Sequence, residues 1–242
     1  MTATLTAHEP QLADQLPDVT NAHMPEEQPT GGWSFKNQAI GSTFTDHVNS
    51  QLKWYNLATE LFCFYAAHYV YPNARVYDFG CSNGNISREL KKVCPAKRYH
   101  MVNIDDSHQM EDNFEGDGDF LQADYRAVDL EPFDVGFFFL SLMFLPACDQ
   151  RKMLTKALSG LREGGVLLIL ERFEPLGGYS SLILQRAVHH AKIVGGVKPE
   201  LAMQKDLSLV GVQRPLTLDV LGDFKVIEIF RYGDFRGFAI QK

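Results

Sequence analysis

One stretch of the chain, Val76 to Asn85, has residue types that suit binding of a charged small molecule. Asp78 precedes Gly80 by two residues, Gly84 follows four residues later, and apolar residues lead into the run. This order predicts a strand, a tight loop and the start of a helix. The glycines allow φ values that a Cβ would forbid, and they let a ligand approach the backbone. A carboxylate at position 78 favours a ligand with positive charge, such as the ammonium and sulfonium of an adenosyl cofactor.

Two more acidic residues follow at informative positions. Asp105 lies 21 residues beyond Gly84 at the end of a second apolar run, and Asp124 ends a short third run. In doubly wound folds, an acidic residue about 20 residues past the glycine loop reaches the ribose hydroxyls of a nucleotide. The stretch lacks both the Lys of a phosphate loop and the three glycines of a dinucleotide site. We therefore expect Asp78, Asp105 and Asp124 to meet at the carboxyl ends of neighbouring strands and to bind an adenosyl group.

The elements that must position these residues alternate along the chain as strand and helix. The run 133–145 is continuously apolar, which predicts a strand that is covered on both faces. The last two strands are close enough to form a hairpin, and we expect an antiparallel closing strand at the edge of the sheet. The predicted strands span residues 75–79, 99–104, 120–123, 133–145, 166–170, 224–230 and 235–240, and the predicted helices span 56–71, 86–93, 153–161 and 180–194.

Composition divides the chain into a tail and one domain. Residues 1–32 hold five acidic residues and no Lys or Arg, while the rest carries 25 acidic and 23 basic residues. We predict a mobile acidic tail over 1–32 and one α/β domain over 33–242 that begins with a helical cap, 33–72. Because acidic and basic residues are nearly balanced over residues 33–242, the sequence indicates no strongly basic surface for binding nucleic acid.

Several classes of protein are disfavoured by what the sequence lacks. No apolar run reaches the roughly 18 to 20 residues of a membrane span, and the first residues do not have the pattern of a signal peptide. The four cysteines contain no C-x-x-C pair, which argues against a zinc site or a disulfide framework. We expect a cytoplasmic protein without a metal site and without a membrane partner.

The motifs together resemble the class I S-adenosylmethionine-dependent methyltransferase superfamily. The glycine loop, the run Val102–Met110 and the run Leu161–Leu167 carry this resemblance. It implies an α/β, Rossmann-like, doubly wound sheet of seven mostly parallel strands with an antiparallel last strand, preceded by N-terminal helices. S-adenosylmethionine is the implied cofactor. The implied cofactor-binding residues are Tyr55, Asp78, Gly80, Cys81, Ser82, Gly84, Asp105, Asp106, Asp124, Tyr125 and Phe139.

A narrower resemblance is to the carboxy-S-adenosylmethionine synthase branch. It rests on Trp33–Phe35, Tyr55, Tyr77–Ser82, Glu171–Phe173 and the pair His189-His190. Members of that branch act with prephenate, feed a tRNA wobble-uridine modification and pair as homodimers. The resemblance therefore implies a homodimer and carboxy-S-adenosylmethionine as an alternative cofactor.

Two positions depart from that branch. Phe139 stands where its members carry Asn at the end of the fourth strand, and Asp206 stands where they carry the Arg that meets the extra carboxylate. Like charges disfavour one another at close range, so Asp206 reverses the sign of that contact. Arg172, Lys205 and Arg214 are the candidates to replace the missing Arg. The departures favour the plain methyl donor over the carboxylated one.

Methyl transfer from a sulfonium depends mainly on positioning, and a base is needed only when the acceptor loses a proton. The candidate catalytic residues are His189, His190 and Tyr55. A helix also buries or exposes His for structural reasons, and Tyr55 alternatively covers the cofactor or packs in the core. The fourth strand lacks an Asn-Pro-Pro-Tyr signature, which disfavours methylation of nucleic-acid amines.

Three hypotheses follow from these patterns. The first is a methyltransferase that acts on a small-molecule or nucleoside-type acceptor. The second is a carboxy-S-adenosylmethionine synthase, and the third is a cofactor-binding interaction protein without turnover.

Overall fold

The computed structural model describes residues 48–49, 51–96, 98–175 and 177–242. The expected acidic tail and the first part of the expected helical cap lie outside these residues. No helix among the described residues is long and apolar enough to cross a membrane.

The described chain is built on one seven-stranded sheet in the order β3-β2-β1-β4-β5-β7-β6. The strands β1 to β5 are parallel to their neighbours, and β7 runs antiparallel to both β5 and β6. The doubly wound, mostly parallel sheet predicted from the sequence is therefore confirmed. The strands are β1 Arg75–Phe79, β2 His100–Asp105, β3 Asp119–Gln122, β4 Phe133–Phe139, β5 Leu161–Arg172, β6 Val226–Tyr232 and β7 Phe235–Gln241.

The expected position of the antiparallel strand was wrong. β7 lies inside the sheet between β5 and β6, and β6 is the edge strand. Most of β7 is buried, whereas β6 contains only exposed and half-buried residues, as expected of an edge strand that faces solvent. The hairpin between these two strands does form, with β6 paired to β7 from Val226 to Tyr232.

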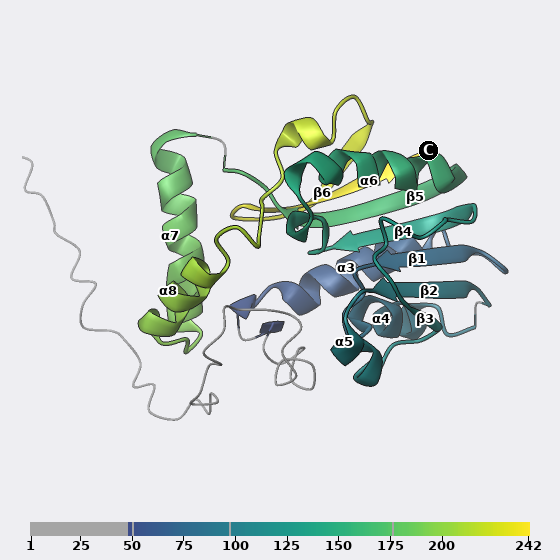
Figure 1. Cartoon of the computed structure of the whole chain (residues 1–242), viewed down its shortest axis with the longest axis horizontal. Coiled ribbons are helices and arrows are strands. Elements are labelled where there is room, and N and C mark those ends of the chain that lie inside the picture. Colours follow the sequence, from purple (N-terminus) through teal and green to yellow (C-terminus); the bar gives the residue numbers. More distant parts are fainter. Residues whose placement is uncertain (1–47, 50, 97, 176) are drawn as a thin grey trace, which may run out of the picture.

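Helices cover both faces of the sheet and divide the core in two. Side chains along a strand point to alternate faces, and β4 follows this rule: Val135 and Phe137 pack with α3 and α4, whereas Phe138 packs with α6. Figure 1 shows α6 across one face of the sheet and α7 and α8 standing apart, beyond the strand ends. The helices are α3 Tyr55–Ala67, α4 Asn85–Val93, α5 His108–Asp112, α6 Ala147–Gly160, α7 Gly178–Val194 and α8 Pro199–Ser208.

The fourth strand ends earlier than its apolar run predicts. β4 stops at Phe139, Leu140 takes a φ of 58°, and residues 142–144 form a short 3-10 helix. The cause is Glu171 at the end of β5, whose carboxylate accepts hydrogen bonds from the backbone N–H groups of Ser141, Leu142 and Met143 at 2.8, 2.7 and 3.2 Å. A buried acceptor thus turns the chain out of the sheet and toward the strand ends.

Candidate functional site

A cavity of about 500 Å³ opens at the carboxyl ends of the parallel strands. Loops that follow β1, β2, β3 and β4 form one side of it, and α7 and α8 form another. This is the place where open α/β sheets bind ligands. The predicted site residues that line it are Tyr55, Asp78, Gly80, Cys81, Ser82, Asp105, Asp106, Asp124, Tyr125, Phe139 and His189.

Asp78 is the most unusual of these residues. Its side chain is 1% exposed, and neither carboxylate oxygen has a hydrogen-bond partner among the described residues. Burial, and secondarily the charge of Asp105, raises the pKa of Asp78 from 3.8 to about 8. A buried carboxylate without a partner is costly, and a cationic ligand group in the cavity would remove that cost.

The two loop glycines have different roles. Gly80 lines the cavity with a φ of 82°, and a Cβ there would lie 2.5 Å from the Cβ of Ser141. Gly84 does not line the cavity; it caps α4 with a φ of 86°, and a Cβ there would lie 2.5 Å from the Cα of Gly116. The structure therefore does not place Gly84 as a cofactor contact, because its backbone packs against a neighbouring loop.

Asp105 ties two loops of the cavity together. Its Oδ2 accepts the Ser82 N–H at 3.0 Å, and its Oδ1 accepts the Ser107 N–H at 3.0 Å. The predicted contact of Asp105 with a ribose stays a prediction, as does a role for its cavity-lining neighbour Asp106. The observed bonds show that Asp105 also holds the backbone of the glycine loop in place.

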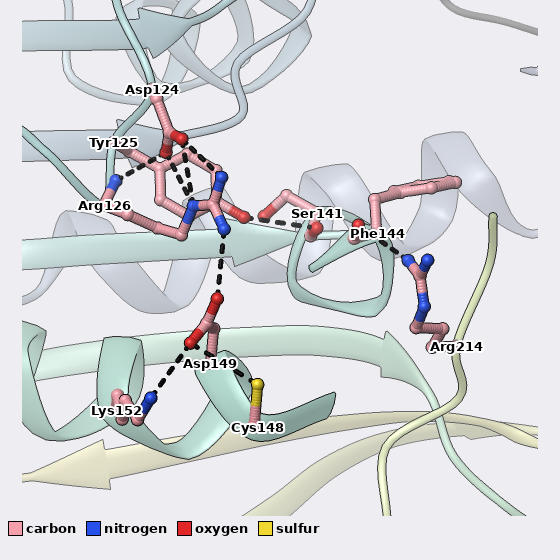
Figure 2. Close-up of polar contacts among 9 residues, drawn as sticks. All are labelled: Asp124, Tyr125, Arg126, Ser141, Phe144, Cys148, Asp149, Lys152 and Arg214. Atoms are coloured by element: carbon pink, nitrogen blue, oxygen red, sulfur yellow. Dashed lines mark hydrogen bonds and ion pairs between the residues drawn. The ribbon is translucent and has the colours of Figure 1, made fainter. Parts of the chain in front are cut away.

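Asp124, which lines the cavity, is paired with the guanidinium of Arg126 (Figure 2). The Arg126 Nη2 lies 2.6 Å from Asp124 Oδ2, and the Arg126 Nη1 lies 3.1 Å from Asp149 on α6. Hydrogen bonding from Arg126 holds the pKa of Asp124 below its usual range. The next residue, Tyr125, donates its hydroxyl to the Ser141 carbonyl at 3.3 Å. Asp124 therefore stays ionised beside the cavity, and its predicted contact with the adenine remains untested.

Aromatic side chains form the apolar floor of the cavity. The rings of Tyr55 and Phe139 meet edge to face at 5.5 Å, and Phe62 packs on Phe139 in the same way. The Tyr55 hydroxyl accepts a hydrogen bond from Asn85 Nδ2 at 3.1 Å, and burial raises the Tyr55 pKa well above its ordinary value. Tyr55 is thus held as a neutral phenol, so the structure does not support it as a base. Asn85 ends the stretch that the sequence analysis singled out, but its contact with Tyr55 and its place in the cavity lining were not predicted.

A cluster of basic residues forms the wall made by α7 and α8. His189 Nε2 contacts Asp206 Oδ2, and Lys192 Nζ lies 3.2 Å from Asp206 Oδ1. Lys205 also lines the cavity, and burial together with the charge of Lys192 lowers its pKa to about 7. His190 is exposed and does not line the cavity, because it lies on the outer face of α7. Lys192 was not foreseen, since it lies on a helix without a recognisable motif.

The three candidate replacements for the missing Arg differ in position. Arg172 lines the cavity, with its Nε 2.5 Å from Asp234 Oδ2 and its Nη1 2.8 Å from Gln213. Lys205 lines it as well. Arg214 does not line it. Its guanidinium donates to the Phe144 carbonyl at 3.3 Å (Figure 2) and to the Val212 carbonyl at 3.1 Å. Only Arg172 and Lys205 are placed to meet an anionic group.

Comparison with known proteins finds a domain match and distant relatives of this chain. A family model described as a methyltransferase domain matches residues 76–165. A carboxy-S-adenosyl-L-methionine synthase of Staphylococcus epidermidis is 25% identical over 191 residues, covering 77% of this chain and 83% of the relative. The protein of the same name from Aliivibrio fischeri is 25% identical over 199 residues, covering 78% and 82%. These matches support a place in the class I S-adenosylmethionine-dependent methyltransferase superfamily, near the carboxy-S-adenosylmethionine synthase branch.

Solved structures of class I methyltransferases agree with the fold. The plantazolicin methyltransferase BpumL, solved with SAH and a triazolic desmethylPZN analog, has a TM-score of 0.57 at 12% identity, covering 85% of this chain and 95% of that one. A putative S-adenosylmethionine-dependent methyltransferase of Methanococcus maripaludis has a TM-score of 0.53 at 15% identity, covering 91% and 97%. These identities show a shared fold.

The methyltransferase-domain match and the relatives named carboxy-S-adenosyl-L-methionine synthase support an S-adenosylmethionine-dependent transferase. Its cavity fits that cofactor on two observations. The unpartnered carboxylate of Asp78 suits a cationic methionyl group, and Gly80 lines the cavity at a point where a Cβ would clash with Ser141.

Proposed function

We propose that this chain transfers the methyl group of S-adenosylmethionine to a small-molecule or nucleoside-type acceptor. The observation that carries the proposal is the buried carboxylate of Asp78, which lines the cavity and lacks a partner among the described residues. The acidic residues at the carboxyl ends of β1, β2 and β3 suit the charged and hydroxyl groups of the cofactor, and the rest of the cavity is available to an acceptor.

The bound cofactor supplies a methyl group that its sulfonium already activates. The protein therefore has to bind and orient the cofactor and the acceptor and to exclude water. Asp78 would hold the cationic methionyl end, and the ring of Phe139 would keep the adjoining floor apolar. His189, paired with Asp206, is the candidate to accept a proton from an acceptor that must lose one. The partner carboxylate would stabilise the protonated imidazole.

Carboxy-S-adenosylmethionine synthesis is a second candidate function. The two relatives described above bear that name, and Arg172 and Lys205 line the cavity where they can meet an added carboxylate. Asp206 opposes it, because it occupies the position where the resemblance implies an Arg. The plain methyl donor therefore remains our first choice.

Native mass spectrometry and a methyl-transfer assay together test the proposal. The purified protein should retain S-adenosylmethionine or S-adenosylhomocysteine, and a cell extract with labelled S-adenosylmethionine should yield a labelled small molecule. The variant Asp78→Asn should retain no cofactor and serves as the control. A retained cofactor heavier by one carboxyl group would favour the second candidate, and cofactor binding without any labelled product would contradict both.

We also propose that the protein pairs as a homodimer and works in the cytoplasm. The outer face of α7 supports pairing, since Val188 is the only buried residue of this helix and Tyr179, Leu182 and Ile183 are exposed. The cysteines of the described chain are free thiols, as is usual for a reducing compartment. A small molecule is the favoured substrate over nucleic acid, because a near balance of charge offers no broad basic surface.

A further inference from the structure

We propose that the hydroxyl of Ser141 is a further binding group of this cavity, and that it accepts a hydrogen bond from the ammonium group at the methionyl end of the cofactor. Glu171 is the positioning residue that holds Ser141 in place. This inference rests on the proposed function, because that function assigns Asp78 to the same cationic end of S-adenosylmethionine.

Ser141 is the first polar residue after β4, and it lines the cavity. The residue is 7% exposed, and its Oγ has no hydrogen-bond partner among the described residues. Most buried polar groups in proteins have a partner, because a hydroxyl without one loses the hydrogen bonds that it makes with water. A ligand in the cavity would supply the missing partner.

The backbone of Ser141 is fixed on both sides. Its N–H donates to Glu171 Oε1 at 2.8 Å, and its carbonyl accepts a hydrogen bond from the Tyr125 hydroxyl at 3.3 Å. The preceding residue, Leu140, has a φ of 58°, which is disfavoured for a residue with a Cβ. Such strain persists only where the surrounding contacts impose it, and it is common at binding sites. The Ser141 hydroxyl is therefore held beside the cavity before any ligand binds.

Ser141 lies beside the glycine loop that follows β1. β1 and β4 are neighbouring parallel strands, with Asp78 opposite Phe137. A Cβ on Gly80 would lie 2.5 Å from the Ser141 Cβ and 3.3 Å from its Oγ. Because Gly80 follows Asp78 by two residues, the Ser141 hydroxyl and the Asp78 carboxylate border the same end of the cavity.

The charge of Asp78 decides which group of the cofactor meets Ser141. A ligand carboxylate at this end would be repelled by the Asp78 carboxylate, whereas an ammonium group is attracted to it. An ammonium group has three N–H donors, and an ionised carboxylate and a hydroxyl oxygen can both accept from it. Asp78 and Ser141 can therefore share one ammonium group.

Three adenosyl ligands separate the possible contacts of the hydroxyl. S-adenosylhomocysteine carries an ammonium and a carboxylate, its decarboxylated derivative carries only the ammonium, and 5′-methylthioadenosine carries neither. In calorimetry, Ser141→Ala should weaken binding of the first two ligands by about tenfold, as loss of one hydrogen bond to a charged group predicts, and should change binding of the third by less than about twofold. Ser159→Ala is the matched control, because Ser159 is exposed on α6 and lies outside the cavity.

Glu171→Gln tests the positioning role. The amide keeps one oxygen for the N–H groups of residues 141–143 and places an NH₂ group where the second oxygen was. We expect the variant to weaken both ammonium ligands more than 5′-methylthioadenosine, and we expect this selective loss to disappear when Ser141→Ala is already present. A merely structural role would weaken all three ligands alike, with or without the Ser141 hydroxyl.

Several results would overturn the inference. An unchanged affinity of Ser141→Ala for S-adenosylhomocysteine, or an equal loss for all three ligands, would contradict the contact of Ser141. A loss for S-adenosylhomocysteine but not for its decarboxylated derivative would assign the hydroxyl to the cofactor carboxylate instead. An effect of Glu171→Gln that does not depend on Ser141 would exclude the positioning role.

Failure of the wild-type protein to bind S-adenosylhomocysteine is a separate outcome, which contradicts the proposed function itself. Far-UV circular dichroism of each variant confirms that it is folded.

Discussion

Replacing Asp78 by Asn tests the central feature of the site. The substitution keeps the shape of the side chain and removes its charge. In the ligand-free protein the carboxylate is 1% exposed, has no partner among the described residues and faces the charge of Asp105. The variant should therefore be more stable than the wild type without ligand, and it should bind the cofactor less tightly.

The magnitude follows from the pKa of Asp78, which rises from 3.8 in a solvated chain to about 8 in the folded protein. Between these two values the folded protein keeps a proton that the unfolded chain has lost. The free energy of unfolding therefore falls as the pH rises, by about 1.4 kcal/mol per pH unit from this group. Asn cannot titrate, so the stability advantage of the variant should grow by about 3 kcal/mol between roughly pH 5.5 and pH 8.

Urea unfolding of the ligand-free proteins at several pH values measures this difference. Asp129→Asn is the matched control, because Asp129 is exposed and does not line the cavity. Calorimetry with S-adenosylmethionine should show a loss of about 1.5 to 3 kcal/mol for Asp78→Asn, which is roughly ten- to hundredfold in affinity. Parallel pH profiles for the wild type and Asp78→Asn, or an unchanged affinity, would refute the assignment of Asp78 to a cationic ligand group.

Three further substitutions probe the walls of the cavity. Asp105→Ala should weaken cofactor binding by about 1 to 3 kcal/mol through loss of charge-assisted contacts, and an unchanged calorimetric affinity would contradict its role. Glu171→Ala should cost about 1 to 3 kcal/mol of stability, since three buried N–H groups lose their acceptor; hydrogen exchange at Ser141–Met143 as slow as in the wild type would argue otherwise. Gly84→Ala should lower the melting temperature far more than Gly164→Ala: both have positive φ, but a Cβ would clash only at Gly84, so equal losses would exclude the close approach as the cause.

The acidic side of the site could be predicted from the sequence. Apolar runs that end at Asp78, Asp105 and Asp124 predicted three strands with their acids at the same edge, and the structure places all three residues around one cavity. This prediction was possible because each apolar run and the acidic residue at its end lie within a few neighbouring positions of the sequence. A buried strand needs a continuous apolar run, and the first polar residue after it marks its end.

Arg172, His189 and Lys205 were named from the sequence, but the arrangement of the basic residues around the cavity could not be predicted, because it depends on contacts between distant residues. The apolar run through Phe139 continues to Leu145. β4 nevertheless ends at Phe139, because the Glu171 carboxylate accepts hydrogen bonds from the backbone N–H groups of residues 141–143. α8 has a single buried residue, Ala202, so its sequence has no periodic apolar pattern from which the helix could be predicted. The meeting of Lys192 and Asp206 across two helices follows from packing, which a linear pattern does not contain.

The position of β7 has a consequence for how the protein is made. β5 is bordered on one side by β7, with Val166 opposite Gln241 and Arg172 opposite Phe235. A ribosome delivers β5 long before β7, so the growing chain carries an unpaired, strongly apolar strand edge while the intervening residues are synthesised. The sheet is complete only after residues 235–241 have been synthesised and β7 has paired with both β5 and β6. We expect this late, long-range step to limit the folding rate and to make the nascent chain a client for chaperones.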